Sequence, residues 1–288
     1  MNKEFTLTIN EESTVKEILT KNLNLSAQLI TNLKKYNDGI LLNGKKVNVN
    51  AKLTFGDKLK IKIYDEKSDI KPKNIPFNIL YEDEDIIVLN KDRNIPTHPS
   101  QNHYEDTLAN ALMYYFKDEN FTFRAITRLD KDTSGIVLVA KNPYSSHILN
   151  EDMKNKKIKK EYFAIINGAL KEKSGVIDAP IKRCENTVMK REVSPFGKEA
   201  ITEYETVKVS GDYSLVHLFP ITGRTHQLRV HLSYLGCAIY GDDLYGAPQK
   251  DGIKLHCGVL EFLHPSAKEK IKIEAPMPKD MEEIINPK

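Results

Sequence analysis

The aspartate at position 130 stands in a basic loop directly before an apolar strand. The string that contains it reads Thr127-Arg128-Leu129-Asp130-Lys131-Asp132-Thr133-Ser134-Gly135, and Ile136 to Val139 follow. An aspartate side chain is ionised at neutral pH, and the flanking cations Arg128 and Lys131 favour that charged form. The carboxylate therefore needs no separate base to act as a nucleophile. Because an aspartate between basic residues is more often a surface ion pair or a turn residue, the rest of the sequence has to decide.

Arginine is rare in this chain and unevenly placed. Only seven of the 43 basic residues are arginines, and six of them fall in three close pairs. Lysine suffices where diffuse positive charge is wanted, whereas the planar fork of arginine binds phosphate or carboxylate through two hydrogen bonds. We therefore predict that these positions contact an anionic partner, with chance clustering as the alternative. The arginines are at positions 93, 124, 128, 183, 191, 224 and 229.

A helix predicted from about Thr225 to Leu235, ending at Gly236, places an arginine beside its apolar face. Arg229 lies next to the apolar stripe rather than opposite it, so it can reach a semi-buried carboxylate. We predict that Arg229 pairs with Asp130 and keeps it ionised and oriented. Arg224, before the helix, is better suited to phosphate. The stripe itself consists of Leu228, His231, Leu232 and Leu235.

Nothing in the sequence requires a metal or an organic cofactor. His226 and His231 lie five residues apart, which is not the i, i+4 spacing of a zinc helix, so packing or RNA contact is the preferred interpretation. Cys184, Cys237 and Cys257 are widely spaced and odd in number, which favours reduced, partly buried thiols. Glycine-rich loops of the phosphate-cradling type are also absent from the sequence. We expect no cofactor and no metal.

The string TRLDKDTSG resembles the signature of the RluA family of pseudouridine synthases, in which the aspartate of the R-L-D triplet is catalytic. Further motifs follow in the order of that family, and the similarity spans about residues 77 to 278. Three positions depart from the family pattern, namely Asp92, Thr127 and Cys257, which puts local substrate contacts in doubt. The matching motifs are KEY at 160–162, PIKR at 180–183, GKEAIT at 197–202, PITGRTHQLRVH at 220–231, Gly241-Asp242, Tyr245-Gly246 and Leu255-His256.

The resemblance implies roles for individual side chains. Asp130 would be the catalytic residue, and Tyr162 would pack against the uracil once the target uridine has been flipped out of its stack. Arg128 would fill the gap left in the RNA or hold its backbone. Arg183 and Arg224 are further candidate RNA contacts. Asp130 would either attack the ribose carbon that bears uracil or abstract a sugar proton to give a glycal, and the sequence does not choose between these routes.

Residues 10–64 are predicted to form a small domain of two helices followed by strands. Thr14 with Glu17 is typical of a capping box, and Ser26 is suited to cap a second helix. Asn43-Gly44 between residues 40–42 and 47–49 predicts a hairpin turn, and residues 58–64 alternate as a half-buried strand requires. This segment resembles the RNA-binding domain named after ribosomal protein S four. It would bind RNA through Lys34, Lys35, Lys45 and Lys46, unless these lysines are an ordinary solvated face.

A linker is predicted over residues 65–75 and a larger domain over 76–288. The larger domain reads as α+β on a largely antiparallel mixed sheet flanked by helices and loops, which is the pseudouridine synthase fold that the resemblance implies. Its predicted strands lie at residues 86–89, 136–140, 162–166, 201–209 and 215–219, and one of its helices begins at Asn142-Pro143.

The resulting hypothesis is an RNA pseudouridine synthase, an isomerase, that acts on structured RNA, with ribosomal RNA favoured over transfer RNA. A non-enzymatic RNA-binding or ribosome-assembly factor is the alternative, and a hydrolytic glycosidase would need a second carboxylate, for which Asp132 is the nearest candidate. The net charge of +3 requires a local basic face for RNA contact. No signal peptide or spanning helix is readable, so a cytoplasmic protein without membrane contact is expected, with a monomer as the default.

Overall fold

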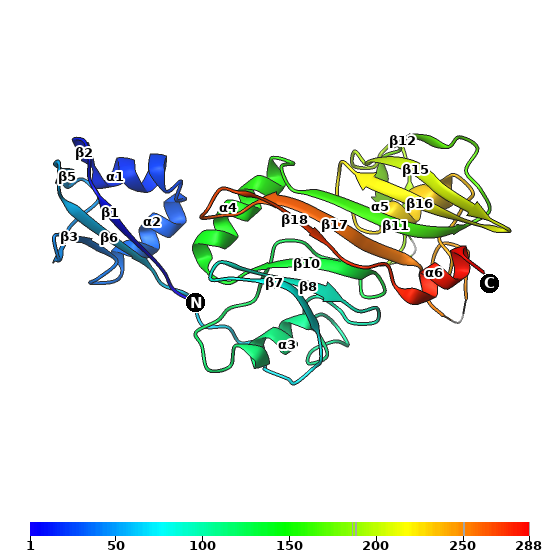
Figure 1. The fold of residues 1–288 in the computed structure, drawn as a ribbon, viewed down its shortest axis with the longest axis horizontal. Coiled ribbons are helices and arrows are strands. Elements are labelled where there is room, and N and C mark those ends of the chain that lie inside the picture. Colours follow the sequence, from blue (N-terminus) through cyan, green and yellow to red (C-terminus); the bar gives the residue numbers. More distant parts are fainter. Residues whose placement is uncertain (186, 188, 250, 288) are drawn as a thin grey trace.

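Two sheets of unequal size organise the chain, one in an N-terminal part (residues 1–64) and one in a main part (residues 76–287) (Figure 1). The computed structural model describes residues 1–185, 187, 189–249 and 251–287. Within those residues no helix is long and apolar enough to cross a membrane. The predicted α+β class is confirmed, because helices accompany a large and mostly antiparallel sheet.

The N-terminal part is a four-stranded antiparallel sheet in the order β1-β6-β3-β4, covered by two short helical segments. The Thr14–Glu17 capping box is present, and the Ser26 hydroxyl accepts from the backbone N–H of Leu29, as the sequence predicts. The elements are β1 Lys3–Thr8, β2 Ser13–Thr14, α1 Val15–Glu17, the π-helical turn η1 Ile18–Asn22, α2 Ala27–Lys34, β3 Ile40–Leu42, β4 Lys45–Lys46, β5 Lys52–Leu53 and β6 Lys58–Ile63.

Two details of the N-terminal part differ from the sequence prediction. Strand β1 precedes residue 10, because every second residue of Lys3–Thr8 is half-buried against β6. The second hairpin strand is Lys45–Lys46 rather than 47–49. Asn43 and Gly44 have positive φ angles of 49° and 81°, so the two-residue turn pairs Leu42 directly with Lys45.

The main part is built on one long sheet in the order β12-β15-β16-β11-β17-β10-β8-β7, with β18 beside β17 and β9 beside β10. The predicted strands and the helix that begins at Asn142-Pro143 are confirmed. Its elements are β7 Asn78–Glu82, β8 Ile86–Lys91, α3 Leu108–Tyr115, β9 Arg124–Ala125, β10 Ser134–Ala140, α4 Pro143–Lys154, β11 Lys159–Asn167, β12 Ser174–Asp178, β13 Ile181–Arg183, β14 Arg191–Val193, β15 Ile201–Ser210, β16 Tyr213–Pro220, α5 Gln227–Tyr234, β17 Leu255–Leu263, β18 Lys270–Glu274 and α6 Lys279–Ile285.

Helix α4 joins the two parts. Its Tyr144 and Ile148 are buried in the hydrophobic core of the N-terminal part, and the Phe5 ring meets Tyr144 edge-on at 4.8 Å between centroids. Lys3 forms an ion pair of 2.7 Å with Asp85 of the main part. Residues 65–75 contain no helix or strand, as expected of a connection, yet the Asp65 side chain is buried and pairs with Arg124. One of the clustered arginines therefore serves the junction.

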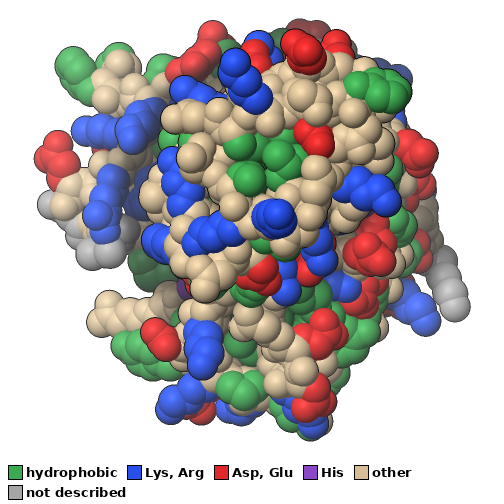
Figure 2. Space-filling model, turned by 90° about the vertical axis from the view of Figure 1, so that its left-hand side faces the viewer, with side chains coloured by type: hydrophobic (Ala, Val, Ile, Leu, Met, Phe, Trp, Pro, Cys, Tyr) green, Lys and Arg blue, Asp and Glu red, His purple; other side chains and the backbone are tan. Residues whose placement is uncertain are grey.

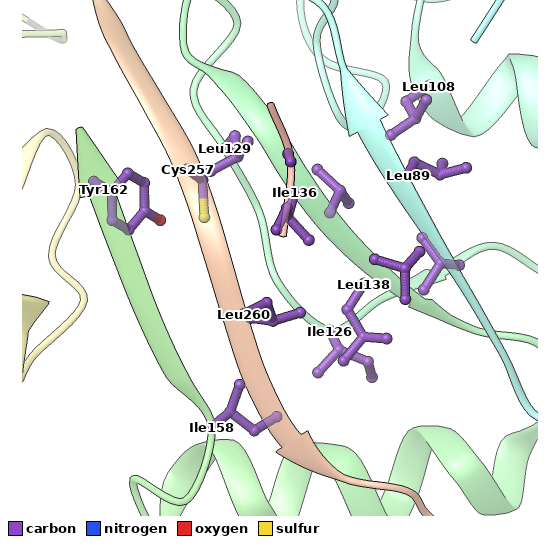
Figure 3. Close-up of a cluster of buried hydrophobic side chains, with 14 of the residues drawn as sticks. Leu89, Leu108, Ile126, Leu129, Ile136, Leu138, Ile158, Tyr162, Cys257 and Leu260 are labelled. Atoms are coloured by element: carbon purple, nitrogen blue, oxygen red, sulfur yellow. The ribbon is translucent and has the colours of Figure 1, made fainter. Parts of the chain in front are cut away.

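Strand β10 is fixed at its start by β17. Among the strand pairs of the described chain, these two alone run parallel, with Ser134 opposite His256 and Gly135 opposite Cys257. Gly135 has a φ of +112°, and a Cβ there would lie 2.2 Å from the carbonyl oxygen of Cys257. Only glycine permits that conformation and that approach. Figure 3 shows the apolar core around this contact, where Cys257 lies near Leu129 and Ile136.

His256 lies under the same junction, and its Nδ1 is 2.9 Å from the Ser134 hydroxyl. Burial lowers its pKa to about 4. The unfolded chain, in which histidine has its ordinary pKa near 6.5, therefore binds a proton between pH 6.5 and 4 that the folded chain does not. The stability contributed by neutral His256 is complete above pH 6.5 and is lost as the pH falls toward 4.

We expect the wild type to lose about 2 to 3 kcal/mol more unfolding free energy between pH 7 and 4.5 than His256→Gln, which lacks the titrating group. Urea unfolding at the two pH values measures this difference. His98→Gln, at an exposed histidine, is the control and should retain the pH dependence of the wild type. Parallel curves for the wild type and His256→Gln would contradict the assignment.

Candidate active site

A cleft of about 140 Å³ lies where the loop before β10, strand β11 and the segment leading into α5 meet. It therefore gathers residues from four of the motifs that the sequence singled out, although these motifs lie far apart in the chain. The lining residues are Arg128, Leu129, Asp130, Thr133, Lys160, Tyr162, Pro220, Thr222, Gly223, Arg224, His226, Gln227, Leu228, Arg229 and Leu255.

The loop that carries Asp130 is held through its backbone. The Thr97 hydroxyl donates to the Leu129 carbonyl at 2.9 Å, and the Thr133 N–H donates to the Asp130 carbonyl at 3.2 Å. The Lys91 ammonium donates to the Lys131 carbonyl at 2.9 Å. These bonds use the backbone on either side of Asp130 and leave its side chain unbonded to the loop, and 35% of that side chain is exposed.

Lys91 is a buried cation that ties two loops together. Besides Lys131 it donates to the carbonyls of Asp92 and Ile95, each at 2.9 Å. Burial lowers the pKa of Lys91 to about 8, against the opposing charges of Asp132 and Asp130. Asp92, where the sequence departs from the family pattern, contributes its backbone carbonyl to this arrangement, which any residue can supply.

Two side chains approach Asp130 from the segment before and within α5. Arg229 Nη1 and His226 Nε2 each lie 3.8 Å from Asp130 Oδ2. Both separations exceed the length of a hydrogen bond. The helix begins at Gln227 rather than at Thr225, and His226 precedes it in the left-handed region with a φ of 57°.

The structure gives Arg229 a closer partner than the one the sequence predicted. Asp242 accepts from Arg229 Nε and Nη2, both at 2.8 Å, and its side chain is fully buried. Burial opposes the charge of Arg229, but the hydrogen bonds and the charge of Asp242 outweigh it and raise the pKa of the guanidinium. Nη1 alone is left for Asp130. Sequence reasoning quoted Asp242 as part of a motif but gave it no role.

Tyr162 lines the cleft from β11 and packs against the core. Its side chain is buried beside Cys257 of the neighbouring strand, as Figure 3 shows. Burial raises the pKa of Tyr162 well above its ordinary value, and burial also raises that of Cys257, to about 11. Both groups are therefore neutral at physiological pH.

The Thr127 hydroxyl accepts from the backbone N–H of Leu138, so the Thr127 side chain, which departs from the family pattern, faces the sheet.

The remaining predicted contacts lie in three places. Arg128 and Arg224 are exposed at the cleft, and Arg224 Nε donates to the Glu199 carbonyl at 2.8 Å. Arg183 is exposed on β13, outside the residues that line the cleft. Lys34, Lys35, Lys45 and Lys46 are exposed on the N-terminal part, at the opposite end of the molecule from α5 in Figure 1.

Lys160 was not singled out from the sequence beyond its place in a motif. It lines the cleft, and burial lowers its pKa. A half-buried cation in a cleft is detectable only once the fold is known, because alternation along β11 does not show which end of a strand opens to solvent. Among the described residues there is no group of three His, Cys, Asp or Glu side chains arranged to hold a metal ion.

Comparisons with known proteins agree on one family. Residues 85–234 match the family described as RNA pseudouridylate synthase. A Bacillus subtilis protein named uncharacterized RNA pseudouridine synthase YjbO is 37% identical over 278 residues, covering 94% of this chain and 98% of that protein. Ribosomal large subunit pseudouridine synthase D of Haemophilus ducreyi is 36% identical and covers 86% of this chain and 82% of its own.

A solved structure gives the same result. Human RNA Pseudouridylate Synthase Domain Containing 1 is 28% identical and superposes with a TM-score of 0.60, covering 74% of this chain and 86% of that chain. This chain therefore shares its fold with that protein over about three quarters of its length.

The Arg229–Asp242 pair predicts a large effect on stability. Asp242→Asn would leave a buried guanidinium without its counter-charge, which costs about 3 to 5 kcal/mol. We expect that loss in urea unfolding at pH 7. Asp243→Asn, at the exposed neighbouring aspartate, is the matched control and should change the free energy of unfolding by less than about 0.5 kcal/mol. Equal stability of the two variants would contradict the pairing.

Proposed function

Because this chain belongs to the RNA pseudouridylate synthase family and is an RNA pseudouridine synthase of the RluA type, we propose that Asp130 is its nucleophile and ribosomal RNA its substrate. The observation that carries the proposal is the Asp130 carboxylate, which opens to the cleft while Arg229 Nη1 and His226 Nε2 stay 3.8 Å from its Oδ2. The names of relatives such as the Haemophilus ducreyi protein support ribosomal RNA.

The reaction breaks the bond between ribose and the uracil nitrogen, turns the base and rejoins it through carbon. The base has to leave its stack for this to happen. The cleft offers an aromatic plate in Tyr162, a carboxylate in Asp130 and exposed arginine at Arg128 and Arg224. In the proposal, Tyr162 packs against the flipped uracil, Arg128 takes the place of the base in the RNA, and Arg224 binds phosphate.

The same residues serve both chemical routes. Asp130 either attacks the ribose carbon or abstracts a sugar proton, and in each case the negative carboxylate is consumed first and restored when the base is recaptured. In the proposal, Arg229 faces Asp130 with Nη1, since its Nε and Nη2 donate to Asp242. Atoms are exchanged within one nucleotide, so the proposal needs no electron acceptor and no group donor.

We also propose that the N-terminal part, residues 10–64 in the sequence prediction, is an RNA-binding domain of the ribosomal protein S four type. Its exposed lysines support the proposal, and Figure 2 shows Lys and Arg side chains across the middle of the face that this part presents, with acidic side chains among them. Lys46 is steadied by Asn37, at 2.9 Å from its Oδ1. Arg183 on β13 is proposed as an RNA contact beyond the cleft. Action as a cytoplasmic monomer stays a prediction from the sequence.

We expect Asp130→Asn to abolish pseudouridine formation, by at least about a thousandfold, because it removes the charge while keeping size and polarity. The measurement is chemical mapping of pseudouridine in total RNA from cells that lack the gene and carry the wild type or the variant. Sites that vanish on deletion and return only with the wild type identify the substrate. Asp132→Asn, at the nearest other carboxylate in the loop, should restore them. Restoration by Asp130→Asn would overturn the role of Asp130.

The N-terminal lysines predict a salt-dependent effect. Lys45→Gln with Lys46→Gln should weaken binding of the target RNA and lower the slope of log affinity against log salt by about 0.7 to 0.9 for each phosphate that the variant no longer neutralises. The control replaces two lysines that are equally exposed at the far end of the main part, Lys171→Gln with Lys173→Gln. If both double variants bind alike at every salt concentration, the hairpin does not contact RNA.

A further inference from the structure

His226 occupies a strained position beside the proposed nucleophile. It is the residue before α5, its φ of 57° lies in the left-handed region, and its side chain makes no capping bond to the helix. A side chain with a Cβ adopts this region at a cost, and such residues concentrate at functional sites. The ring is nine-tenths buried, with 11% of the side chain exposed. The conformation therefore serves to place the imidazole, not to begin the helix.

The hydrogen bonds around His226 determine which ring nitrogen carries the proton. The backbone N–H of Arg191 donates to the Tyr245 hydroxyl oxygen at 2.9 Å. The hydroxyl hydrogen is then available for His226 Nδ1, at 3.0 Å. If Nδ1 accepts this hydrogen, it has a lone pair and no proton, and the proton of the neutral ring sits on Nε2. That nitrogen is the one that faces Asp130.

The imidazole is held in its neutral form. Burial lowers the pKa of His226, which the charge of Asp130 opposes, while Arg229 and Arg191 lower it further and Asp242 raises it. A neutral Nε2–H stabilises a carboxylate less than an imidazolium would, because hydrogen bonds from charged donors are about twice as strong. A nucleophile held in this way keeps more of its reactivity.

Arg229 and His226 both face the same oxygen of Asp130, Oδ2. The shortest separation to Arg229 Nη1 and the shortest to His226 Nε2 both end at Oδ2, at 3.8 Å. We propose that His226 is a positioning residue whose Nε2–H, fixed by Tyr245, joins Arg229 in holding Asp130 Oδ2, so that Oδ1 is the oxygen that reacts with the ribose. This inference rests on the proposed role of Asp130 as the nucleophile.

One turn orients both donors. Asp242 fixes Arg229 through two hydrogen bonds, and the backbone N–H of Tyr245 donates to Asp242 Oδ1 at 3.2 Å. The Arg229 guanidinium lies over the Tyr245 ring at 5.2 Å, and the hydroxyl of that ring contacts His226. Displacing this turn would therefore release both groups that face Oδ2.

The arrangement distinguishes His226 from a general base. A base needs an unprotonated nitrogen directed at the substrate, but the unprotonated nitrogen of His226 is occupied by Tyr245 and the protonated one faces the cleft. His226 therefore acts as a donor throughout the cycle, and no proton transfer through its ring is part of the proposal.

The first test is the tautomer itself. Two-bond ¹H–¹⁵N correlation spectra of the ¹⁵N-histidine-labelled full-length enzyme at pH 7 should assign His226 as the neutral Nε2–H form. Tyr245→Phe, which removes the hydroxyl and keeps the ring, should shift His226 toward a mixture of tautomers. An Nδ1–H or doubly protonated ring in the wild type would overturn the proposal, whatever the activity of the variants.

The second test asks whether glutamine at position 226, whose amide nitrogen can reach the position of Nε2, restores activity that shorter side chains lose. Gln at 226 puts its N–H near the position of Nε2, whereas the shorter Asn and Ala do not. We expect His226→Asn and His226→Ala to lose about a hundredfold in kcat on the mapped RNA, with KM changed less than about threefold. His226→Gln should regain most of this loss. If Gln and Ala are equally impaired, His226 has a structural role only.

Asp130→Asn in the same assay separates the two proposals. If it stays active, the proposed function of Asp130 fails even where the tautomer is as expected. If it is inactive while His226→Ala retains the kcat of the wild type, Asp130 keeps its role and the positioning of Oδ2 by His226 is overturned. Circular dichroism of each variant confirms that the fold is intact before kinetics are compared.

Discussion

A buried guanidinium needs a counter-charge nearby, and the partner that Arg229 has for this purpose determines how the rest of the cleft is arranged. Its partner is the fully buried Asp242, not the carboxylate that opens to the substrate. Had Asp130 been the bidentate partner, both of its oxygens would have been committed to strong charge-assisted bonds. The pairing with Asp242 satisfies the buried charge and leaves only Nη1 of Arg229 facing Asp130, at 3.8 Å from Oδ2. Stability and reactivity are thereby assigned to two different aspartates.

The second requirement is rigidity of the loop that carries Asp130, and it is met by backbone contacts. Lys91 donates to three carbonyls from two loops, and Gly135 lets β10 approach the backbone of β17 closely. Lys91 bonds to the carbonyl of Lys131, the residue next to Asp130, and Gly135 lies five residues after Asp130. Because they act on the main chain, the side chains at 127, 92 and 257 are free to differ from the family pattern without moving Asp130.

Sequence reasoning succeeded where the determining interactions are local. Caps such as Thr14 and Ser26, the Asn43-Gly44 turn and the apolar strands depend on neighbours within a few positions, and all are found in the structure. The pairing of Arg229 with Asp242 was missed although the two are only 13 residues apart, because a turn that no pattern predicted brings them together. The contacts of His226 were equally inaccessible, since its partner Tyr245 is itself bonded by Arg191, 54 residues away in sequence. What the sequence could not supply was the direction of side chains in space.

The junction between the two parts bears on how an RNA would be recognised. Tyr144 and Ile148 of α4 are core residues of the N-terminal part, and the Lys3–Asp85 pair is nearly excluded from water. An N-terminal part held in this way cannot swing independently without exposing that apolar surface, which costs about 25 cal/mol for each Å². The exposed lysines and the cleft therefore keep a fixed separation and orientation. If both regions contact RNA as proposed, a rigid pair would select RNA by its three-dimensional shape, because only a folded RNA would place a flippable uridine in the cleft while its backbone lies along the lysines. A flexible tether would instead admit any strand long enough to reach both.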